Sequence, residues 1–468
     1  MNDGQEIASI KSEVLSRIRP TKEDWEGVIK AVEVVRGRIL EAARAKGLNV
    51  RVEVEGSIAK DTWISTDRDV DLFIIFPQET NREVITGAGM ELAKAGAGEK
   101  WKTGYAEHPY VEAEVLGCKM DIVPSGELVP GKKVMTAVDR TPLHTVYVKE
   151  RLSEAGKDEV RVLKQFMKGI GVYGAELKVG GFSGYLCELI IIRYGSFEET
   201  LRVASAWGLG EVIDIEGHYS HGSALEAFDS PLVVVDPVDR GRNAAAAVTP
   251  RALVTFISAS RHFIKKPSLA FFFPRTDQIG IGELKRMLKG RATEVMAIET
   301  ACPSLPSDVL WGEVYHSLSK IVGFLREKGF RIFDSTAWSD EREKVVFMLE
   351  LESGRLPEAE LHLGPSVVFP EDEERFLEKH LKSRKMIAGP FIAGERWHII
   401  RRREGVDARE LLEESLPKMK LSPDIAAEIR RSFSIISAGE LIGRSEDRPG
   451  LMREIFIFLR KRPLWLER

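Results

Sequence analysis

Two aspartates stand two positions apart in the segment DVDLFIIF, at Asp69 and Asp71. The β-branched and aromatic residues of this segment predict a central strand over 69–76, so both carboxylates share one face of it. Neighbouring carboxylates repel each other unless a cation lies between them. Asp121 is a third acid within a strand-like, apolar segment. Such oxygen ligands suit Mg²⁺, and two such ions can clamp a phosphoryl displacement. The three acids therefore predict a metal-dependent phosphoryl-transfer site.

A glycine–serine pair, Gly56 and Ser57, precedes these acids and lies between a predicted strand and a short helix. Glycine permits the tight turn, while the backbone N–H groups of a helix N-terminus and the serine hydroxyl can hold a phosphate. Two aspartates alone are more often a solvated strand edge. However, the whole pattern resembles the signature of the polymerase-β-like nucleotidyltransferase superfamily. In this pattern Gly-Ser is followed by eleven residues and then by Asp-Val-Asp and apolar residues.

The elements that must position these residues form a small α/β domain. Thr21 is expected to cap a long helix, since an acid follows three residues later. Alternating apolar residues predict a strand over 49–55, followed by the short helix and the strand over 69–76. A hairpin is predicted over 110–124, with Gly117 at its bend.

Beyond this domain the pattern changes twice. From about residue 145 it becomes helical, and a strand is predicted over 230–237. Six further segments then predict the order β-α-β-β-α-β, which is ferredoxin-like. They are TEVMAIETA, SDVLWGEVYHSLSKIVGFLREKG, FRIFDSTAWSD, EKVVFMLELES, EDEERFLEKHLKSRK and PFIAGERWHIIRRR. We therefore predict an α+β multidomain chain with a polymerase-β-like nucleotidyltransferase head (1–144), a mostly helical neck (145–260), a ferredoxin-like body (261–405) and a helical tail (406–468).

Composition sets further bounds. A chain of 468 residues is too long for a single core, and 30% charged with 43% hydrophobic residues is typical of soluble proteins. We expect no membrane span and no signal peptide. The three cysteines are widely separated, which favours a reducing, cytoplasmic location. The net charge of −4 argues weakly against RNA binding, but residues 261–291 hold eight Lys/Arg against two acids. This segment is equally typical of an RNA contact and of a solvated helix face.

The segments AEHPYVEAEV, AVDRTPLH, EVRVLKQFMK, YGAELKVGGFSGYLCEL, DPVDRGRNAAA and PSLAFF resemble, in this order, the archaeal (class I) CCA-adding enzymes. The resemblance runs from about residue 45 to the ferredoxin-like region and weakens in the tail. It implies Mg²⁺-dependent attack by the 3′-hydroxyl of a tRNA acceptor end on the α-phosphate of CTP or ATP. Pyrophosphate leaves, and C, C and A are added without a nucleic-acid template. A homodimer is also common in the family.

The resemblance assigns roles within the predicted head. It matches Asp69, Asp71 and Asp121 with the metal-binding carboxylates of the family. It matches Ser57 and Lys60 with the phosphate-binding turn. The family usually has arginine at the second of these positions, and a lysine keeps the positive charge but loses the bidentate fork.

The resemblance also assigns roles outside the head. The residues matched with contacts to the triphosphate and ribose are Thr141, His144, Lys164 and Tyr173. Arg242 is matched with recognition of the incoming base together with the RNA end. From the residues alone, other interpretations stay open. The histidine and the tyrosine could be packing residues, the lysine could extend from an amphipathic helix to solvent, and the arginine could pair with an acid of the DPVD segment.

Two other functions are compatible with the same scaffold. A poly(A) polymerase or an oligoadenylate synthetase would share the carboxylates but would use ATP alone. A catalytically silent RNA-binding protein would have lost one or more carboxylates, whereas all three are present. Use of CTP therefore separates the enzymatic alternatives.

Overall fold

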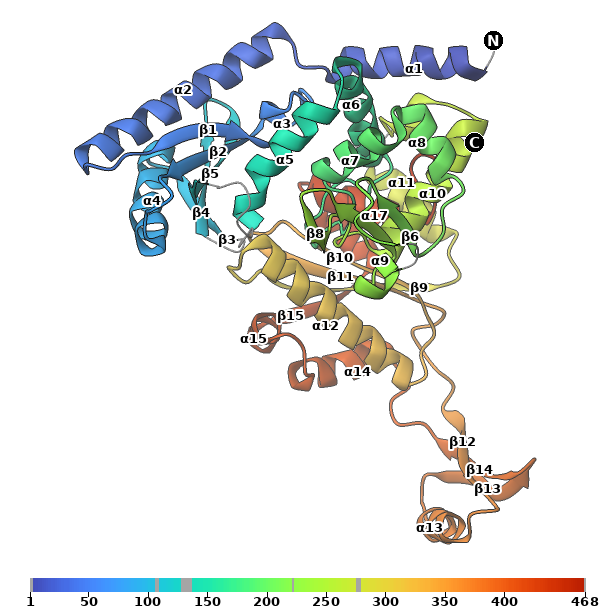
Figure 1. Ribbon diagram of the computed structural model, residues 1–468. Helices are drawn as coiled ribbons and strands as arrows, with labels where there is room; N and C mark the ends of the chain where they lie inside the picture. The colour runs from blue at the N-terminus through green and yellow to red at the C-terminus, as the bar shows by residue number, and fades with distance from the viewer. Residues whose placement is uncertain (1–2, 106–108, 128–136, 221–222, 275–278, 467–468) are drawn as a thin grey trace. The chain divides into compact units, whose positions relative to one another are not determined.

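The chain folds into two compact units in a computed structural model (Figure 1). The structure describes residues 3–105, 109–127, 137–220, 223–274 and 279–466. One unit comprises Met1–Arg275 with Pro463–Arg468, and the other comprises Thr276–Arg462. The described helices include none with the length and apolar character that crossing a membrane requires.

A five-stranded sheet forms the predicted head, with the strand order β1-β2-β5-β4-β3. Its strands are β1 (Arg51–Glu55), β2 (Asp69–Phe76), β3 (Trp101–Tyr105), β4 (Pro109–Val115) and β5 (Cys118–Gly126). The pair β2–β5 is parallel, and the other neighbouring pairs are antiparallel. The predicted strand over 69–76 and the predicted hairpin are confirmed, whereas β3 was not predicted.

Local signals account for the elements of the head. Thr21 caps α2 (Lys22–Ala45) through a reciprocal capping box with Asp24, as predicted. The hairpin β4–β5 turns through Leu116 and Gly117, whose φ angles of 52° and 77° are both positive. This is the two-residue turn whose twist matches that of the strands. The apolar faces of α2 and α4 (Arg82–Ala97) pack with the sheet in one core.

The rest of the first unit is mostly helical, as expected. Its helices are α1 (Asp3–Ile18), α3 (Gly56–Ala59), α5 (Ala137–Arg151), α6 (Glu154–Gly169), α7 (Gly184–Tyr194), α8 (Phe197–Ala204), α9 (Ser223–Ala227) and α10 (Pro250–Lys265). A small sheet in the order β6-β7-β8 joins them, made of β6 (Glu211–Asp214), β7 (Leu232–Asp236) and β8 (Asp239–Asn243). The core is strongly aromatic: Phe166 contacts five other phenylalanine rings.

The second unit is built on a four-stranded antiparallel sheet in the order β10-β11-β9-β15. Its strands are β9 (Glu294–Ala301), β10 (Ile332–Ser339), β11 (Lys344–Leu351) and β15 (Phe433–Ser437). Together with α12 (Ser307–Glu327) and α15 (Pro423–Arg431), these elements follow one another as β-α-β-β-α-β.

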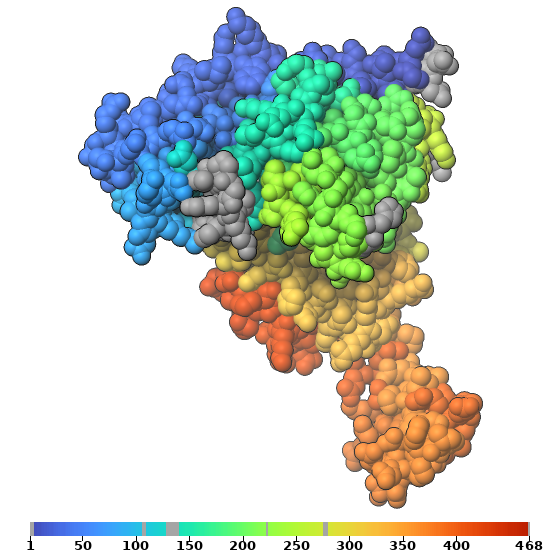
Figure 2. All heavy atoms as spheres, viewed as in Figure 1, coloured from blue at the N-terminus to red at the C-terminus, as the bar shows by residue number. Residues whose placement is uncertain are grey.

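The last two elements of that order are not the ones we predicted. The segments 371–385 and 390–403 do form a helix and strands, but they belong to a separate three-stranded sheet in the order β12-β14-β13. Its elements are β12 (Ala359–Ser366), α13 (Pro370–Leu381), β13 (Met386–Ala393) and β14 (Arg396–Arg402). Their atoms form a compact orange group of their own in Figure 2. The pattern identified the helix, but the single strand predicted over 390–403 is two strands, β13 and β14, and they belong to a different sheet.

The C-terminal residues also differ from a separate helical tail. β15 pairs with β9 over five residues and completes the four-stranded sheet. The remaining helices of the second unit are α11 (Ile281–Lys289), α14 (Ala408–Ser415), α16 (Ala438–Arg444) and α17 (Pro449–Arg460). Trp465 packs in the first unit, with its ring stacked at 5.2 Å on that of Phe271. The short strand at 433–437 carried too weak a local signal to be predicted.

Candidate active site

A row of carboxylates crosses the five-stranded sheet. Asp71 of β2 lies opposite Asp121 of the parallel strand β5, and Asp121 lies opposite Glu112 of β4. On the other side of Asp71, β1 contributes Glu55. Residues paired across neighbouring strands project from the same face, so the sheet brings Asp71 and Asp121 together. Asp69 shares this face, lies two residues earlier on β2 and is exposed.

The surroundings of this row disfavour isolated negative charge. Burial raises the pKa of Asp121 to about 7, opposed by Lys119 and reinforced by the neighbouring acids Asp71 and Glu112. Burial likewise raises the pKa of Asp71. The Oδ1 atom of Asp121 is buried and has no hydrogen-bond partner among the described residues. Adjacent, half-buried carboxylates with a buried, unpartnered oxygen suit a hard divalent cation.

Asp69 borders an open hollow of about 460 Å³, lined in part by Thr66, Arg68 and Lys119. Within the described part of the chain, no group of three or more acidic, histidine or cysteine side chains is arranged to hold a metal ion. The structure therefore places Asp71 and Asp121 side by side, with Asp69 nearby on the same strand. Their role as metal ligands stays a prediction.

The glycine–serine turn contacts the carboxylate row directly. Gly56 has a φ of +66°, a value that side chains rarely adopt. A Cβ atom built on Gly56 would lie 1.8 Å from Oδ2 of Asp71, so only glycine lets the chain pass this close to the carboxylate. Ser57 follows as the second residue of α3, at the N-terminal end of a single turn of helix. The turn is thus held against β2, and its phosphate-binding role stays a prediction.

The two lysines that were predicted to bind phosphate, Lys60 and Lys164, meet at a buried carboxylate. Nζ of Lys60 donates to Oε2 of Glu188 at 2.5 Å, and Nζ of Lys164 lies 3.6 Å from Oε1 of the same residue. Thr62 donates its hydroxyl to Oε1 of Glu188 and lies 3.2 Å from Nζ of Lys164. Lys164 is only 2% exposed, so it does not extend to solvent from an amphipathic helix.

Charge decides the state of this cluster. Burial alone would raise the pKa of Glu188, but Lys60 and Lys164 hold it below its usual value. Burial lowers the pKa of Lys164, which Glu188 partly offsets. The cluster contains two lysines and one carboxylate, so with both lysines protonated it carries one surplus positive charge. Such a surplus favours the approach of an anion.

Tyr173 lies next to this cluster. A Cβ atom built on Gly184 would lie 3.1 Å from the hydroxyl oxygen of Tyr173 and 3.4 Å from Nζ of Lys164. The ammonium of Lys168 lies 5.5 Å from the centre of the tyrosine ring. Gly184, at the start of α7, therefore leaves room for the tyrosine and the lysine to converge. Two of the four residues that were expected to contact the triphosphate and ribose, Lys164 and Tyr173, therefore lie close together.

A second cluster surrounds Asp236, at the end of β7. Nε2 of His144 lies 2.9 Å from Oδ2 of Asp236, and Arg242 donates from Nη1 to the same oxygen at 2.7 Å. Tyr185 donates its hydroxyl to Oδ1 of Asp236 at 3.2 Å. The imidazole of His144 stacks on the ring of Tyr185, with 3.9 Å between ring centres. Arg242 thus pairs with an acid of the DPVD segment, the alternative that the residues alone had left open.

Tyr185 links the two clusters. One side of its ring stacks on His144, and the ammonium of Lys60 lies 5.5 Å from its centre. Thr141 lies three residues before His144 on α5, where its carbonyl oxygen accepts a hydrogen bond from Thr145. His144, Lys164 and Arg242 are therefore gathered around residues of α7 and their partner Asp236.

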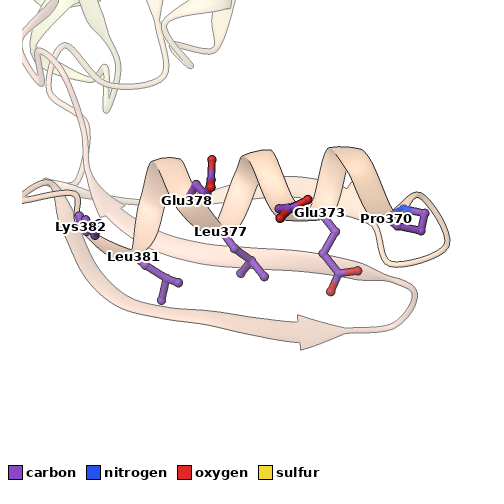
Figure 3. A pocket seen from close by; sticks show the side chains of 7 residues that line it. Pro370, Glu373, Leu377, Glu378, Leu381 and Lys382 are labelled. Carbon is purple, nitrogen blue, oxygen red and sulfur yellow. The ribbon is translucent and has the colours of Figure 1, made fainter.

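A larger hollow elsewhere has a different character. It measures about 720 Å³ and lies along α13 in the second unit (Figure 3). Glutamates 373, 374 and 378 and a single lysine, Lys382, line it, and the apolar side chains of Leu377 and Leu381 lie beside them. An acidic surface repels phosphate groups, and none of the predicted site residues lies there. Size alone therefore does not identify the site.

Comparison with known proteins agrees with this geometry. Residues 36–144 match the family model of a nucleotidyltransferase domain. Residues 158–273 match the second domain of tRNA nucleotidyltransferase, and residues 291–438 match the C-terminal domain of CCA-adding enzyme. The three matches follow one another along the chain and include the head sheet, the α7 clusters and the four-stranded sheet.

Full-length relatives decide the assignment. The chain is 36% identical over 441 residues to the CCA-adding enzyme of Methanothermobacter thermautotrophicus, covering 93% of this chain and 95% of the relative. It is 37% identical over 431 residues to that of Methanosarcina barkeri, covering 91% and 93%. The chain belongs to the CCA-adding enzyme family. A third member, from Sulfurisphaera tokodaii, is 40% identical over 359 residues, covering 76% of this chain and 81% of the relative.

In this member of the family, the structure adds residues that the sequence did not single out. These are Glu188 and Tyr185, which organise the two clusters around α7 together with Asp236, an acid already considered as a partner of Arg242. All three lie in segments that carry the resemblance to CCA-adding enzymes, GFSGYLCEL and DPVDRGRNAAA. A signal was present, because Glu188 interrupts an otherwise apolar run of helix and Asp236 ends a fully buried strand. An acid in such a place requires a partner.

Proposed function

We propose that the chain completes tRNA by adding C, C and A to its 3′ end without a nucleic-acid template. The 3′-hydroxyl of the RNA attacks the α-phosphate of CTP or ATP, and pyrophosphate leaves. Family membership over more than nine-tenths of the chain supports the overall reaction. The observation that supports its location is the register of Asp71 with Asp121, next to the Gly56 turn.

Asp69, Asp71 and Asp121 are the residues that would hold divalent cations, which we take to be Mg²⁺. The buried, unpartnered Oδ1 of Asp121 and the adjacent Asp71 fit such a donor set. Bound cations would activate the attacking hydroxyl and neutralise the charge that develops on the phosphates. The protein's own part is to fix the carboxylates on a rigid sheet, with Gly56 closing against them.

The nucleotide is assigned to the residues around α7. Lys60, Lys164 and Tyr173 converge beside the glycine–serine turn, and the surplus positive charge of the lysines suits a triphosphate. We assign Ser57 to the phosphates, Thr141 and His144 to the ribose and triphosphate, and Arg242 to the base together with the RNA end. These roles follow from the family resemblance.

The larger organisation is proposed on the same basis. A head (1–144) and a neck (145–260) would enclose the nucleotide, and the ferredoxin-like body would hold the acceptor stem by its shape and phosphates. The βαββαβ order in that body is completed by α15 and β15 rather than by residues 371–403. Assembly as a homodimer and a location in the cytoplasm are proposals from the resemblance and the cysteine pattern.

The reaction is tested with a tRNA that lacks its 3′ CCA, using CTP and ATP separately and together. Growth by two residues with CTP alone, and by a third only after ATP is added, is the expected result. Sizing the products on a sequencing gel distinguishes the alternatives. Long A tails without use of CTP would instead indicate a poly(A) or oligoadenylate enzyme. No extension under any condition would leave an RNA-binding scaffold.

Added Mg²⁺ is expected to raise the unfolding midpoint more at about pH 8 than at about pH 5.5. The pKa of Asp121, about 7 in the folded state, is raised from 3.8. As pH rises from 3.8 to about 7, the contribution of this residue to the stability of the folded state is lost. The carboxyl group gives up its proton there and leaves an uncompensated negative charge. A cation replaces the proton at higher pH.

Thermal scans with MgCl₂, against NaCl of equal ionic strength, measure this effect. The Asp121→Asn variant is the matched control, because its amide carries no charge at either pH. Its response to Mg²⁺ should be small and should not change with pH. Equal stabilisation of the unmodified protein at both pH values would contradict the assignment of Asp121 to a cation.

A further inference from the structure

Asp236 is a carboxylate in an unusual place. It ends β7, whose five residues are all buried, and its side chain has no exposed surface. A buried carboxylate costs several kcal/mol of folding free energy unless it is fully paired. Asp236 is the one charged residue of β7, and the groups that contact its carboxylate indicate its role.

Four donors saturate the two oxygens of Asp236. Oδ2 faces Nε2 of His144 at 2.9 Å and accepts from Nη1 of Arg242 at 2.7 Å. Oδ1 accepts from the hydroxyl of Tyr185 at 3.2 Å and from the backbone N–H of Val238 at 3.1 Å. The three side chains come from α5, α7 and β8, so one carboxylate fixes three separate segments.

Two of these partners are residues assigned above to the nucleotide. Arg242 and His144 are the residues assigned above to the base and to the ribose and triphosphate. Arg242 remains 35% exposed while it pairs with the fully buried acid, so part of its guanidinium stays open to a ligand. Two contacts fix the imidazole of His144: Asp236 lies at Nε2, and the ring of Tyr185 stacks on its face.

We infer that Asp236 is a positioning residue for nucleotide selection, which holds Arg242 and His144 in one fixed arrangement around the incoming nucleotide. This inference rests on the proposed function. A guanidinium that selects between bases must be held closely, because a site discriminates through hydrogen bonds whose geometry the wrong base cannot meet. Asp236 fixes the position of the Arg242 guanidinium through its hydrogen bond, and Tyr185 orients the imidazole of His144 by stacking on it.

A purely structural bridge would behave differently. It would stabilise the fold, and its loss would reduce the amount of active enzyme without changing KM or base selection. A positioning residue changes the nucleotide KM and the discrimination between bases. The two roles are therefore separated by measurements on the folded fraction.

The Asp236→Asn variant keeps the shape of the side chain and removes its charge. We expect the KM for CTP and ATP to rise by about 10- to 100-fold, the scale seen when a residue that orients a metal ligand is lost. We also expect UTP and GTP to be incorporated relatively more often. Asp239→Asn is the matched control, since Asp239 lies in the same turn but pairs with Arg140. Its KM and base selection should stay near those of the unmodified enzyme.

A double-mutant cycle shows whether Asp236 acts through Arg242. In an Arg242→Ala background, Asp236→Asn should cause little further loss of base selection, because residues that act as a unit are not additive. If Asp236→Asn does not fold, Tyr185→Phe tests the same carboxylate. It removes only the hydroxyl and keeps the ring on His144, and a several-fold rise in KM is expected.

The outcomes distinguish failure of the proposed function from failure of the positioning role of Asp236. If the unmodified protein adds no nucleotide, the proposed function fails. If it adds CCA normally while Asp236→Asn retains KM and base selection, the positioning role is overturned. Additive losses in the cycle, or an unchanged KM with a lower active fraction, would likewise reduce Asp236 to a structural bridge.

Discussion

The Asp71→Asn variant is expected to add nucleotides with a kcat lower by about three orders of magnitude, the scale of losing one essential electrostatic group from an active site. Asp71 lies opposite Asp121 on the parallel strand, and its Oδ2 is the atom against which Gly56 closes. An amide fits the same space but brings no negative charge to a bound cation. Single-turnover extension of a tRNA lacking CCA, with saturating radiolabelled CTP, measures this directly.

Stability separates this loss from unfolding. Burial raises the pKa of Asp71, so the ionised acid is an unfavourable charge in the folded state. Removing that charge should leave the unfolding midpoint unchanged or raise it near neutral pH. An inactive variant that is at least as stable as the unmodified protein would thus be diagnostic of a functional carboxylate.

Glu112→Gln supplies the control for Asp71→Asn on the same row. Glu112 lies opposite Asp121 on β4, and its Oε1 accepts a hydrogen bond from the hydroxyl of Tyr110 at 2.9 Å. Glutamine can keep that bond, so most of the activity should remain. Near-normal turnover by Asp71→Asn, or an equal loss with Glu112→Gln, would contradict the choice of catalytic carboxylates.

The head could be predicted in detail because its signals are local. The apolar segment after Asp69 is long enough to be read as a strand, and Gly117 marks the turn of the hairpin. The spacing of Gly56 from Asp69 then placed the turn beside the acids. β3, over Trp101–Tyr105, was missed because its short sequence WKTGY has no alternation of apolar and polar residues.

The second unit shows what local patterns leave undecided. Residues 371–385 include the predicted helix, and residues 390–403 contribute to two strands rather than to the one predicted, yet these strands belong to a separate sheet. The strand that completes the four-stranded sheet is only five residues long and comes more than 130 residues after its partner β9. Which strands pair depends on long-range packing, and periodicity contains no information about it.

Some residues of the site could be predicted from the sequence, whereas others depend on long-range packing. The acids at 69, 71 and 121 were predicted as metal ligands because the Gly-Ser turn, its spacing from Asp69 and a third acid on a downstream strand occur together. The lysines were found through the resemblance, whereas their shared partner Glu188 was not. One acid in a helix says nothing about which distant side chains will meet it. The clusters exist only once α3, α6 and α7 pack together.

Glu188→Gln is expected to lower the free energy of unfolding by about 3–5 kcal/mol near pH 7, the usual cost of breaking a buried ion pair from one side. Glu188 has 1% of its side chain exposed and lies within 3.6 Å of both ammonium groups. Glutamine can accept a hydrogen bond from Lys60, but the two lysines would then face each other without a counter-charge.

The pH dependence gives this prediction its sign. Because the lysines hold the pKa of Glu188 below its usual value of 4.5, its stabilising contribution is present above that value and is lost as pH falls through the lowered pKa. The difference between the variant and the unmodified protein should therefore shrink in acid. Urea unfolding at several pH values, followed by tryptophan fluorescence, measures it.

A surface glutamate provides the comparison for Glu188→Gln. Glu199 on α8 pairs with Arg202, but its side chain is 41% exposed, so Glu199→Gln should cost less than about 1 kcal/mol. The folded fraction of Glu188→Gln should also bind nucleotide more weakly, because loss of the carboxylate makes protonation of the buried Lys164 less favourable. A variant as stable as Glu199→Gln would show that the lysines do not depend on Glu188, and the surplus charge assigned to triphosphate binding would need another origin.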